Sequence, residues 1–146
     1  MRHGKDDRTL DLFSVPQPVL AVPGQGNYSA QVSELVGGIL KASDLERPEV
    51  AAQMSRLSGD DVSKLMLDAW SSPARMDHNI PLYRVALLEQ VCETSQLTDW
   101  LVSQRGGRVA YGRDALLAEL GRLERAKEEA SRMARELRRV LGGSHG

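Results

Sequence analysis

The chain has 146 residues, a hydrophobic content of 41% and a formal net charge of −1. This length and apolar content predict one domain with appendages, and the scarcity of aromatic residues predicts an aliphatic core. A single cysteine excludes an internal disulfide and leaves no thiolate cluster for zinc. We expect a cytoplasmic protein with no membrane contact, because the chain has neither a bilayer-spanning apolar run nor a secretory signal.

Residues 1–27 predict a flexible arm, because prolines and glycines are frequent there and no helical period is present. Within this arm, residues 9–13 form a short apolar motif, TLDLF. Its positions Leu10, Asp11, Leu12 and Phe13 resemble the motif with which bacterial proteins dock on the sliding clamp of DNA replication, with Thr9 in place of the usual glutamine. The resemblance implies a protein partner. Packing of the arm on its own domain, or on a dimer partner, is the competing interpretation, and it is the favoured one.

Residues 28–107 predict an all-α domain, because apolar residues recur there at three- and four-residue spacing. The first helix is capped by Asn27 or Ser29 and runs to about Ala42. Its predicted buried face consists of Val32, Leu35, Val36, Ile39 and Leu40. Gly37 and Gly38 lie in its middle; each costs about 1 kcal/mol relative to alanine, and both allow a close contact with another helix.

Residues 47–72 predict two short amphipathic helices joined by a turn. Pro48 suits the first turn of the first helix, Gly59 ends that helix, and Asp60 or Asp61 caps the second. The predicted buried residues are Val50, Ala51, Met54 and Leu57 in the first helix, and Val62, Leu65, Met66, Ala69 and Trp70 in the second. The predicted outward-facing residues of the second helix are Ser63, Lys64, Leu67, Asp68 and Ser71.

This outline is that of a helix-turn-helix, whose second helix can lie in the major groove of DNA. We expect Ser63, Lys64 and Leu67 to contact the duplex, with phosphate contacts from Arg56 and Arg75. A helical hairpin that touches no nucleic acid is the alternative. Charge favours that alternative, because residues 44–81 hold four basic and seven acidic side chains, whereas a DNA reader normally carries a basic footprint.

The rest of this domain predicts a loop and two further helices. The loop carries His78, which has no partner at metal-ligand spacing. Pro81 opens a helix that runs to about Cys92, a small core residue. The apolar residues of this helix are Val85, Leu88 and Val91, with Tyr83 and Leu87 at the edge, and those of the next are Leu97, Trp100 and Leu101. We expect the two tryptophans, Trp70 and Trp100, to help fill one core.

Residues 108–141 predict a long C-terminal helix, and residues 142–146 a flexible tail. From residue 112 the segment lacks proline and is rich in good helix formers. Its heptad positions are Leu116, Leu120, Leu123, Lys127, Ala130, Ala134, Leu137 and Leu141. A lone helix of this length buries too little to persist in water. A coiled coil with a second copy, most simply a dimer, is therefore favoured, and packing on its own domain is the alternative.

Motifs of catalysis and of cofactor binding are missing from the sequence. It has no HExxH, GxSxG, Walker loop or dinucleotide fingerprint. The acidic residues of the C-terminal helix alternate with arginines, which is typical of ion pairs on a solvated helix face. We therefore expect a protein that is not an enzyme and that holds neither a metal nor a cofactor.

Two runs of the sequence resemble a known group of proteins. The runs EVAAQMSRLSGDDVSKLMLDAWSS and NIPLYRVALLEQVCETSQLTDWLVSQRGG, within residues 49–107, look like the CII-type helix-turn-helix regulators of temperate and Mu-like phages and prophages. The resemblance implies DNA binding in transcription control, with oligomerisation through the C-terminal helix. The competing hypothesis is a non-enzymatic interaction protein of a phage early region, in which the TLDLF motif docks a partner such as the sliding clamp.

Overall fold

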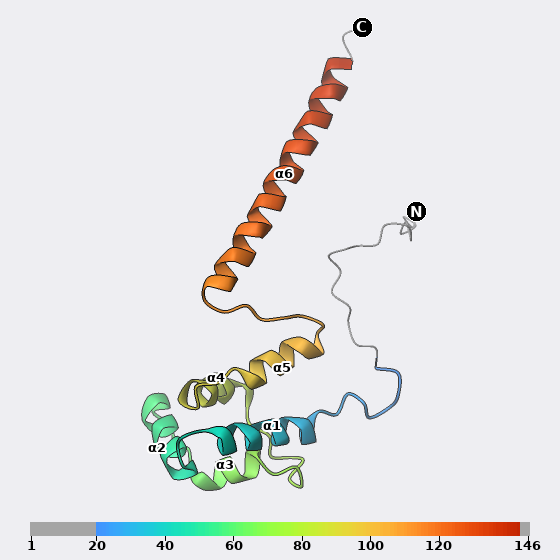
Figure 1. Cartoon of the computed structure of the whole chain (residues 1–146). Coiled ribbons are helices and arrows are strands. Elements are labelled where there is room, and N and C mark those ends of the chain that lie inside the picture. Colours follow the sequence, from blue (N-terminus) through green and yellow to red (C-terminus); the bar gives the residue numbers. More distant parts are fainter. Residues whose placement is uncertain (1–19, 144–146) are drawn as a thin grey trace. The chain divides into compact units, whose positions relative to one another are not determined.

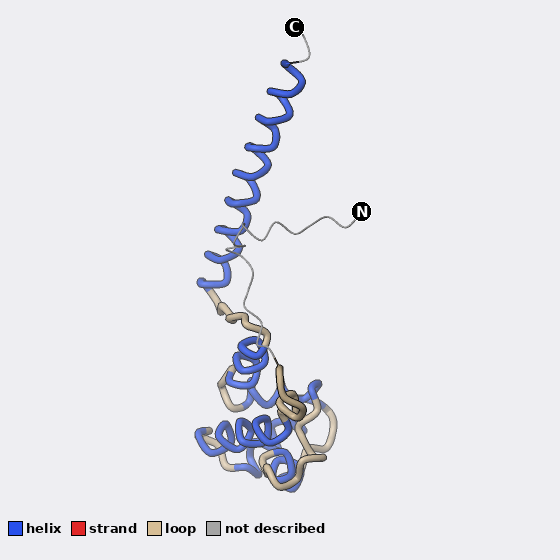
Figure 2. Tube along the Cα trace, turned by 90° about the vertical axis from the view of Figure 1, so that its right-hand side faces the viewer, coloured by secondary structure: helices blue, strands red, loops and turns tan. Residues whose placement is uncertain are grey.

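The computed structural model describes residues 20–143, and every regular element within them is an α-helix (Figure 2). In chain order these are α1 (Ser29–Ala42), α2 (Arg47–Ser58), α3 (Lys64–Trp70), α4 (Leu82–Val91), α5 (Gln96–Gln104) and α6 (Arg113–Gly143) (Figure 1). The chain divides after Arg108 into two compact units, so that α1–α5 form one unit and α6 belongs to the other. The all-α prediction, with a long C-terminal helix, is confirmed.

The five helices α1–α5 surround one aliphatic core. Helix α2 packs against α3 and α4, α1 packs against α3 and α5, and α4 packs against α5. The core contains Val36, Ile39, Leu40, Val50, Ala51, Met54, Val62, Leu67, Trp70, Ile80, Leu88, Val91 and Leu97. Every helix of this unit therefore contributes at least one buried apolar side chain, which explains why short helices persist here.

Helix α1 has the predicted bounds and the predicted buried face. Val36, Ile39 and Leu40 are buried, and Val32 and Leu35 pack against them. The prediction that Asn27 or Ser29 is the N-cap is wrong: Tyr28 has this position and makes no side-chain cap hydrogen bond, although the Asn27 side chain accepts a hydrogen bond from the Ser29 N–H at 3.2 Å. The arm before it is only partly described: residues 20–27 form a turn in which the Gln25 side chain accepts backbone hydrogen bonds, and the TLDLF motif lies outside the described residues.

The two glycines of α1 differ in their surroundings. A Cβ built on Gly37 would lie 3.5 Å from the Ser71 carbonyl oxygen, so α1 passes the end of α3 closely, as expected. A Cβ on Gly38 would meet nothing within 4 Å. Gly38 therefore serves no close contact, and it costs stability because a glycine loses more conformational entropy on folding than other residues do.

Gly38→Ala should raise the free energy of unfolding by about 0.5–1 kcal/mol, because alanine loses less conformational entropy in a helix. Urea unfolding followed by tryptophan fluorescence measures the difference. Gly59→Ala is the contrasting control: Gly59 has a φ of 75°, which disfavours a residue with a Cβ, so this second variant should lose stability. Equal effects of the two substitutions would contradict the prediction.

The loop between α3 and α4 is fastened to α1 by side-chain hydrogen bonds. The Asn79 amide donates to the Ser29 carbonyl oxygen at 2.9 Å and to the Ser33 hydroxyl at 3.0 Å. The Ser29 hydroxyl donates to the Met76 carbonyl oxygen at 2.6 Å. Ser33 is fully buried, so these bonds satisfy polar atoms inside the unit.

Helices α4 and α5 are joined by a buried carboxylate that the sequence pattern did not reveal. Glu89 is 6% exposed, and its two carboxylate oxygens accept hydrogen bonds from the Thr98 hydroxyl at 2.5 Å and the Thr98 N–H at 3.3 Å. Glu89 thus caps the first turn of α5 from outside that helix. The prediction that Leu101 is buried is wrong, since half of this side chain is exposed.

Candidate functional site

The connection between α2 and α3 is a tight, internally bonded turn. Gly59 ends α2 in the left-handed conformation, and its N–H donates to the Ser55 carbonyl oxygen at 3.0 Å. The Ser55 hydroxyl accepts a hydrogen bond from the Val62 N–H at 2.9 Å, and Val62 is buried. The turn is therefore held to the last part of α2, and the direction of α3 is fixed.

Helix α3 begins later than the sequence predicted. Its N-cap is Ser63, whose hydroxyl accepts a hydrogen bond from the Met66 N–H at 3.2 Å. The prediction that Asp60 or Asp61 caps this helix is wrong, and both of these side chains are exposed. Val62 and Ser63 precede the helix, and Ser63 has extended backbone, so a helical period counted from Val62 does not predict which side chains of α3 are buried.

The later start of α3 reverses the predicted burial of two leucines, Leu65 and Leu67. Leu67 is fully buried, whereas Leu65 is 77% exposed. The predictions that Leu67 faces outward and that Leu65 is buried are both wrong. Leu67 and Trp70 lie three residues apart and form the inner face of α3, which places Leu65 on the outer side. In α2, the prediction that Leu57 is buried is also wrong, since it is more than half exposed.

The outer face of α3 carries a small cluster of charges around Asp68. Nη1 of Arg47, at the start of α2, lies 2.7 Å from Oδ1 of Asp68. Nζ of Lys64 lies 2.8 Å from Oδ2 of the same carboxylate. Arg47 also donates to the Ser71 hydroxyl at 3.0 Å. This cluster ties α3 to α2 and leaves the face with one positive charge in excess.

The two cations lower the pKa of the Asp68 carboxyl below its ordinary value of 3.8, Lys64 contributing most and Arg47 next. A carboxyl with a lower pKa in the folded than in the unfolded protein stabilises the fold above its unfolded pKa. That contribution disappears as the pH falls through the folded pKa. The Asp68 cluster therefore stabilises the hairpin at neutral pH and weakens in acid.

We expect Asp68→Asn to reduce the loss of stability between about pH 7 and about pH 3, because the neutral amide has no proton to gain. Urea unfolding at both pH values measures this loss. The matched control is Asp61→Asn, which removes an exposed carboxylate from the preceding turn. If both variants lose as much stability in acid as the unmodified chain, the cluster does not support the fold.

The two arginines predicted to contact phosphates lie on different elements. Arg56 is exposed in the last turn of α2, and Arg75 is exposed in the loop after α3. The charge around them is unfavourable for DNA: residues 20–108 carry eight basic and eleven acidic side chains. The other three predicted contact residues are also separated. Lys64 lies on the outer face of α3, Ser63 is the N-cap of that helix, and Leu67 lies in the core.

Arg84 is a buried cation whose role the sequence analysis missed. It is 9% exposed, and its guanidinium carbon lies 5.6 Å from the Trp70 ring centroid and 5.4 Å from the Tyr83 ring centroid. Such positions over aromatic faces are favourable for a guanidinium. Arg84 therefore joins α4 to the end of α3. The only sequence signal of this contact is that Tyr83 directly precedes Arg84.

Helix α6 is an amphipathic helix with no buried residue. All the leucines that were predicted to form its heptad seam are at least half exposed: Leu116, Leu120, Leu123, Leu137 and Leu141. Ion pairs on its polar side, Arg122–Glu119 and Arg139–Glu136, link residues three apart at 2.6 Å. The structure thus confirms the helix and its apolar stripe. The stripe forms no part of a core within the described residues.

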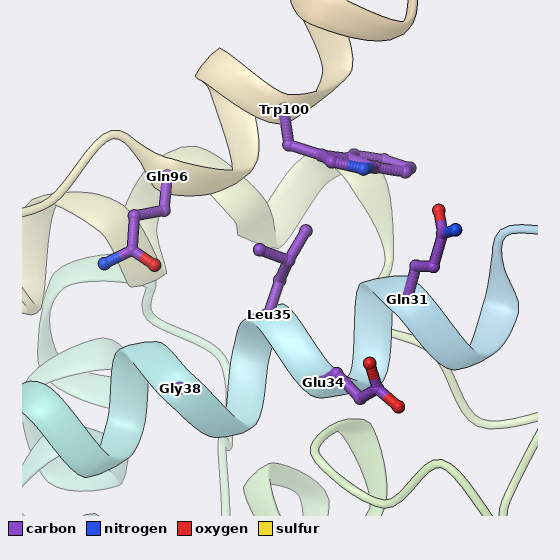
Figure 3. Close-up of a pocket in the computed structure, with 6 residues that line it drawn as sticks. All are labelled: Gln31, Glu34, Leu35, Gly38, Gln96 and Trp100. Carbon is purple, nitrogen blue, oxygen red and sulfur yellow. The ribbon is translucent and has the colours of Figure 1, made fainter.

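A shallow pocket of about 330 Å³ lies between α1 and α5 (Figure 3). Leu35 points from α1 toward α5, between Gln96 and the Trp100 indole. Trp100 is half-buried and meets the Tyr28 ring edge-on at 5.4 Å, so it lies beside the core rather than within it, unlike Trp70. The lining offers an apolar floor and neutral amides, with Glu34 at the edge.

The structure also shows the surroundings of two further reactive side chains, His78 and Cys92. His78 lies 2.8 Å from the carboxylate of its neighbour Asp77 on an exposed loop. Burial raises the pKa of the Cys92 thiol, which makes it a weaker nucleophile at neutral pH. In the part of the chain that the structure describes, no three His, Cys, Asp or Glu side chains are grouped to hold a metal ion.

These features define a small all-α protein with a packed helical unit and a separate amphipathic helix. Among residues 20–143 no helix combines the length and the apolar character that a membrane crossing needs. Comparison with known proteins yields no relative: no protein-family model, no curated protein and no solved structure matches the chain.

Proposed function

We propose that the protein is a DNA-binding regulator that acts as an oligomer. In this proposal the α1–α5 unit contacts duplex DNA through the outer face of α3, and α6 joins copies of the chain. The observation that carries the proposal is the fixed α2–turn–α3 hairpin, which buries Leu67 and exposes Lys64 and Leu65 in the first turn of α3. In a helix-turn-helix, this part of the second helix reaches the base edges.

The proposed contacts follow from which side chains are exposed. Lys64 binds a phosphate, and Leu65 replaces Leu67 as the apolar side chain that meets a thymine methyl group. Arg56 supplies a second phosphate contact from the end of α2. Ser63 acts indirectly, because its hydroxyl caps α3 and so orients Lys64. The resemblance of residues 49–107 to CII-type phage regulators agrees with this assignment.

A second candidate function is protein binding without DNA, and the charge of the α1–α5 unit favours it. Residues 20–108 have three more acidic than basic side chains, whereas DNA-binding surfaces attract phosphates through clustered cations. Under this hypothesis the hairpin is a scaffold, and the N-terminal arm and α6 contact proteins. The two functions differ in one measurable property, which is a salt-dependent affinity for duplex DNA.

The decisive experiment is a fluorescence anisotropy titration of the full chain with random-sequence duplexes of about 30 base pairs at two salt concentrations. Lys64→Glu should weaken binding and lower the salt slope by about one phosphate contact. Asp68→Asn should strengthen binding, because it removes a negative charge beside Lys64. Arg105→Glu, a charge reversal at the end of α5, is the control and should change affinity least. No binding at low salt, or equal effects of the three substitutions, would overturn DNA reading by α3.

A further inference from the structure

We propose that α6 pairs with α6 of a second copy in the antiparallel direction, with Leu120 opposite the partner's Leu137. This inference rests on the self-association in the proposed function and specifies its geometry. The same register places Leu116 opposite the partner's Leu141, Leu123 opposite the partner's Ala134, and Lys127 opposite the partner's Ala130. The contact is two-fold symmetric, so each of these pairs occurs twice.

The apolar stripe of α6 needs a cover that the described chain does not supply. The helix has 31 residues and none of them is buried, while its seam positions from Leu116 to Leu141 follow a regular alternation of four- and three-residue steps. That alternation is the spacing that places side chains along the seam of a coiled coil. An exposed stripe of this length is characteristic of an interaction surface rather than of an ordinary solvated helix.

The sizes of the seam residues select the direction of pairing. Large side chains occupy both ends of the seam, and the two alanines lie on the C-terminal side of its centre. In a parallel pair, Ala130 and Ala134 each face their own copies, which leaves space unfilled at two neighbouring layers. In the antiparallel register, Leu123 fills the space beside the partner's Ala134. The seam is therefore complementary to its own reversed copy.

The charge of Lys127 also favours antiparallel pairing. A parallel pair brings two Lys127 ammonium groups together in one layer of the seam, where their charges repel. In the antiparallel register, Lys127 faces the partner's Ala130, whose small side chain leaves room for the lysine stem. The stem can then cover apolar surface while the ammonium group reaches water.

Charges beside the seam also oppose a parallel pair. Glu119 and Glu124 occupy the flanking positions that meet across a parallel coiled coil, so two like-charge contacts would form. The segment 132–139 holds four arginines and one glutamate, and a parallel pair would place both of these basic segments side by side. Antiparallel pairing places each basic segment beside the first half of the partner's helix, in which acidic and basic side chains balance. It also makes the two helix dipoles run in opposite directions, which is the favourable arrangement.

Disulfide mapping on the full chain tests the direction. Two proteins are prepared in a Cys92→Ala background, one with Leu120→Cys and the other with Leu137→Cys. They are mixed, unfolded, refolded together and oxidised, and the linked peptides are identified by mass spectrometry. We expect the disulfide between positions 120 and 137 to exceed either self-linked product several-fold, because only facing residues come within disulfide distance. A mixture of Leu120→Cys and Leu123→Cys is the control and should link poorly.

Two results would overturn the proposal. Predominant disulfides from 120 to 120 and from 137 to 137 would establish a parallel pair. Failure of all mixtures to link, together with monomers in sedimentation equilibrium of the unmodified protein, would show that α6 does not pair with its own copy. The mapping is carried out without DNA, whereas DNA reading by α3 is measured by titration, so the direction of pairing and the reading of DNA are tested independently.

Discussion

Replacing Leu123 and Leu137 by lysine should yield monomers and unwind much of α6. Each buried leucine contributes about 1.5–3 kcal/mol, and a dimer would lose four of them, so the dissociation constant should rise by at least about 10⁴-fold. The α1–α5 unit should remain folded, because α6 contributes no residue to its core. Sedimentation equilibrium measures the assembly, and far-ultraviolet circular dichroism measures the loss of helix.

The matched control places the same two charges on the polar side of α6. Ala118→Lys with Gly121→Lys leaves every heptad position unchanged, so this variant should remain associated and helical. If the seam variant and the control behave alike, the leucines of α6 do not hold copies together. In that case the proposal that α6 joins copies of the chain is wrong, whatever the result of the DNA titration.

The second large effect concerns the exchanged leucines of α3. Leu67→Ala should lower the free energy of unfolding by about 2–5 kcal/mol, because it removes a fully buried side chain and leaves a cavity in the core. Leu65→Ala should change stability by no more than about 0.5 kcal/mol, since this side chain is 77% exposed. Urea unfolding monitored by tryptophan fluorescence compares the two variants.

The same pair of variants separates structural from functional roles. Leu65→Ala should weaken binding to the duplex pool while leaving the fold intact, because the proposed methyl contact is lost. A larger loss of stability in Leu65→Ala than in Leu67→Ala would contradict the assignment of the inner face of α3. Such a result would support the sequence-based prediction, in which Leu65 is buried and Leu67 faces outward.

Local sequence signals were sufficient for most of the helices. Proline at the start of α2, glycine at its end and the apolar spacing of α1 are features of neighbouring residues, and they placed these helices correctly. The heptads likewise predicted α6. These signals work because helix formation depends first on residues within three or four positions of one another.

The candidate site was harder to predict because its geometry depends on distant residues. Ser63 and not an aspartate caps α3, because Val62 is drawn into the core and held to Ser55 before the helix begins. Arg47 reaches Asp68 across 21 positions in the sequence. Helical periodicity contains no information on such contacts, so the face of α3 could not be assigned from it.

The hydrogen bonds between the α3–α4 loop and α1 have a consequence for proteolysis. A long exposed loop with proline and aspartate is normally a preferred site of cleavage. Here Asn79 and Ser29 attach the loop to the first turn of α1, so a protease can extend the chain around Arg75 only after these hydrogen bonds break. Trypsin should therefore cut slowly after Arg75 in the folded protein. Breaking the attachment with Asn79→Ala should expose this bond well before the core unfolds.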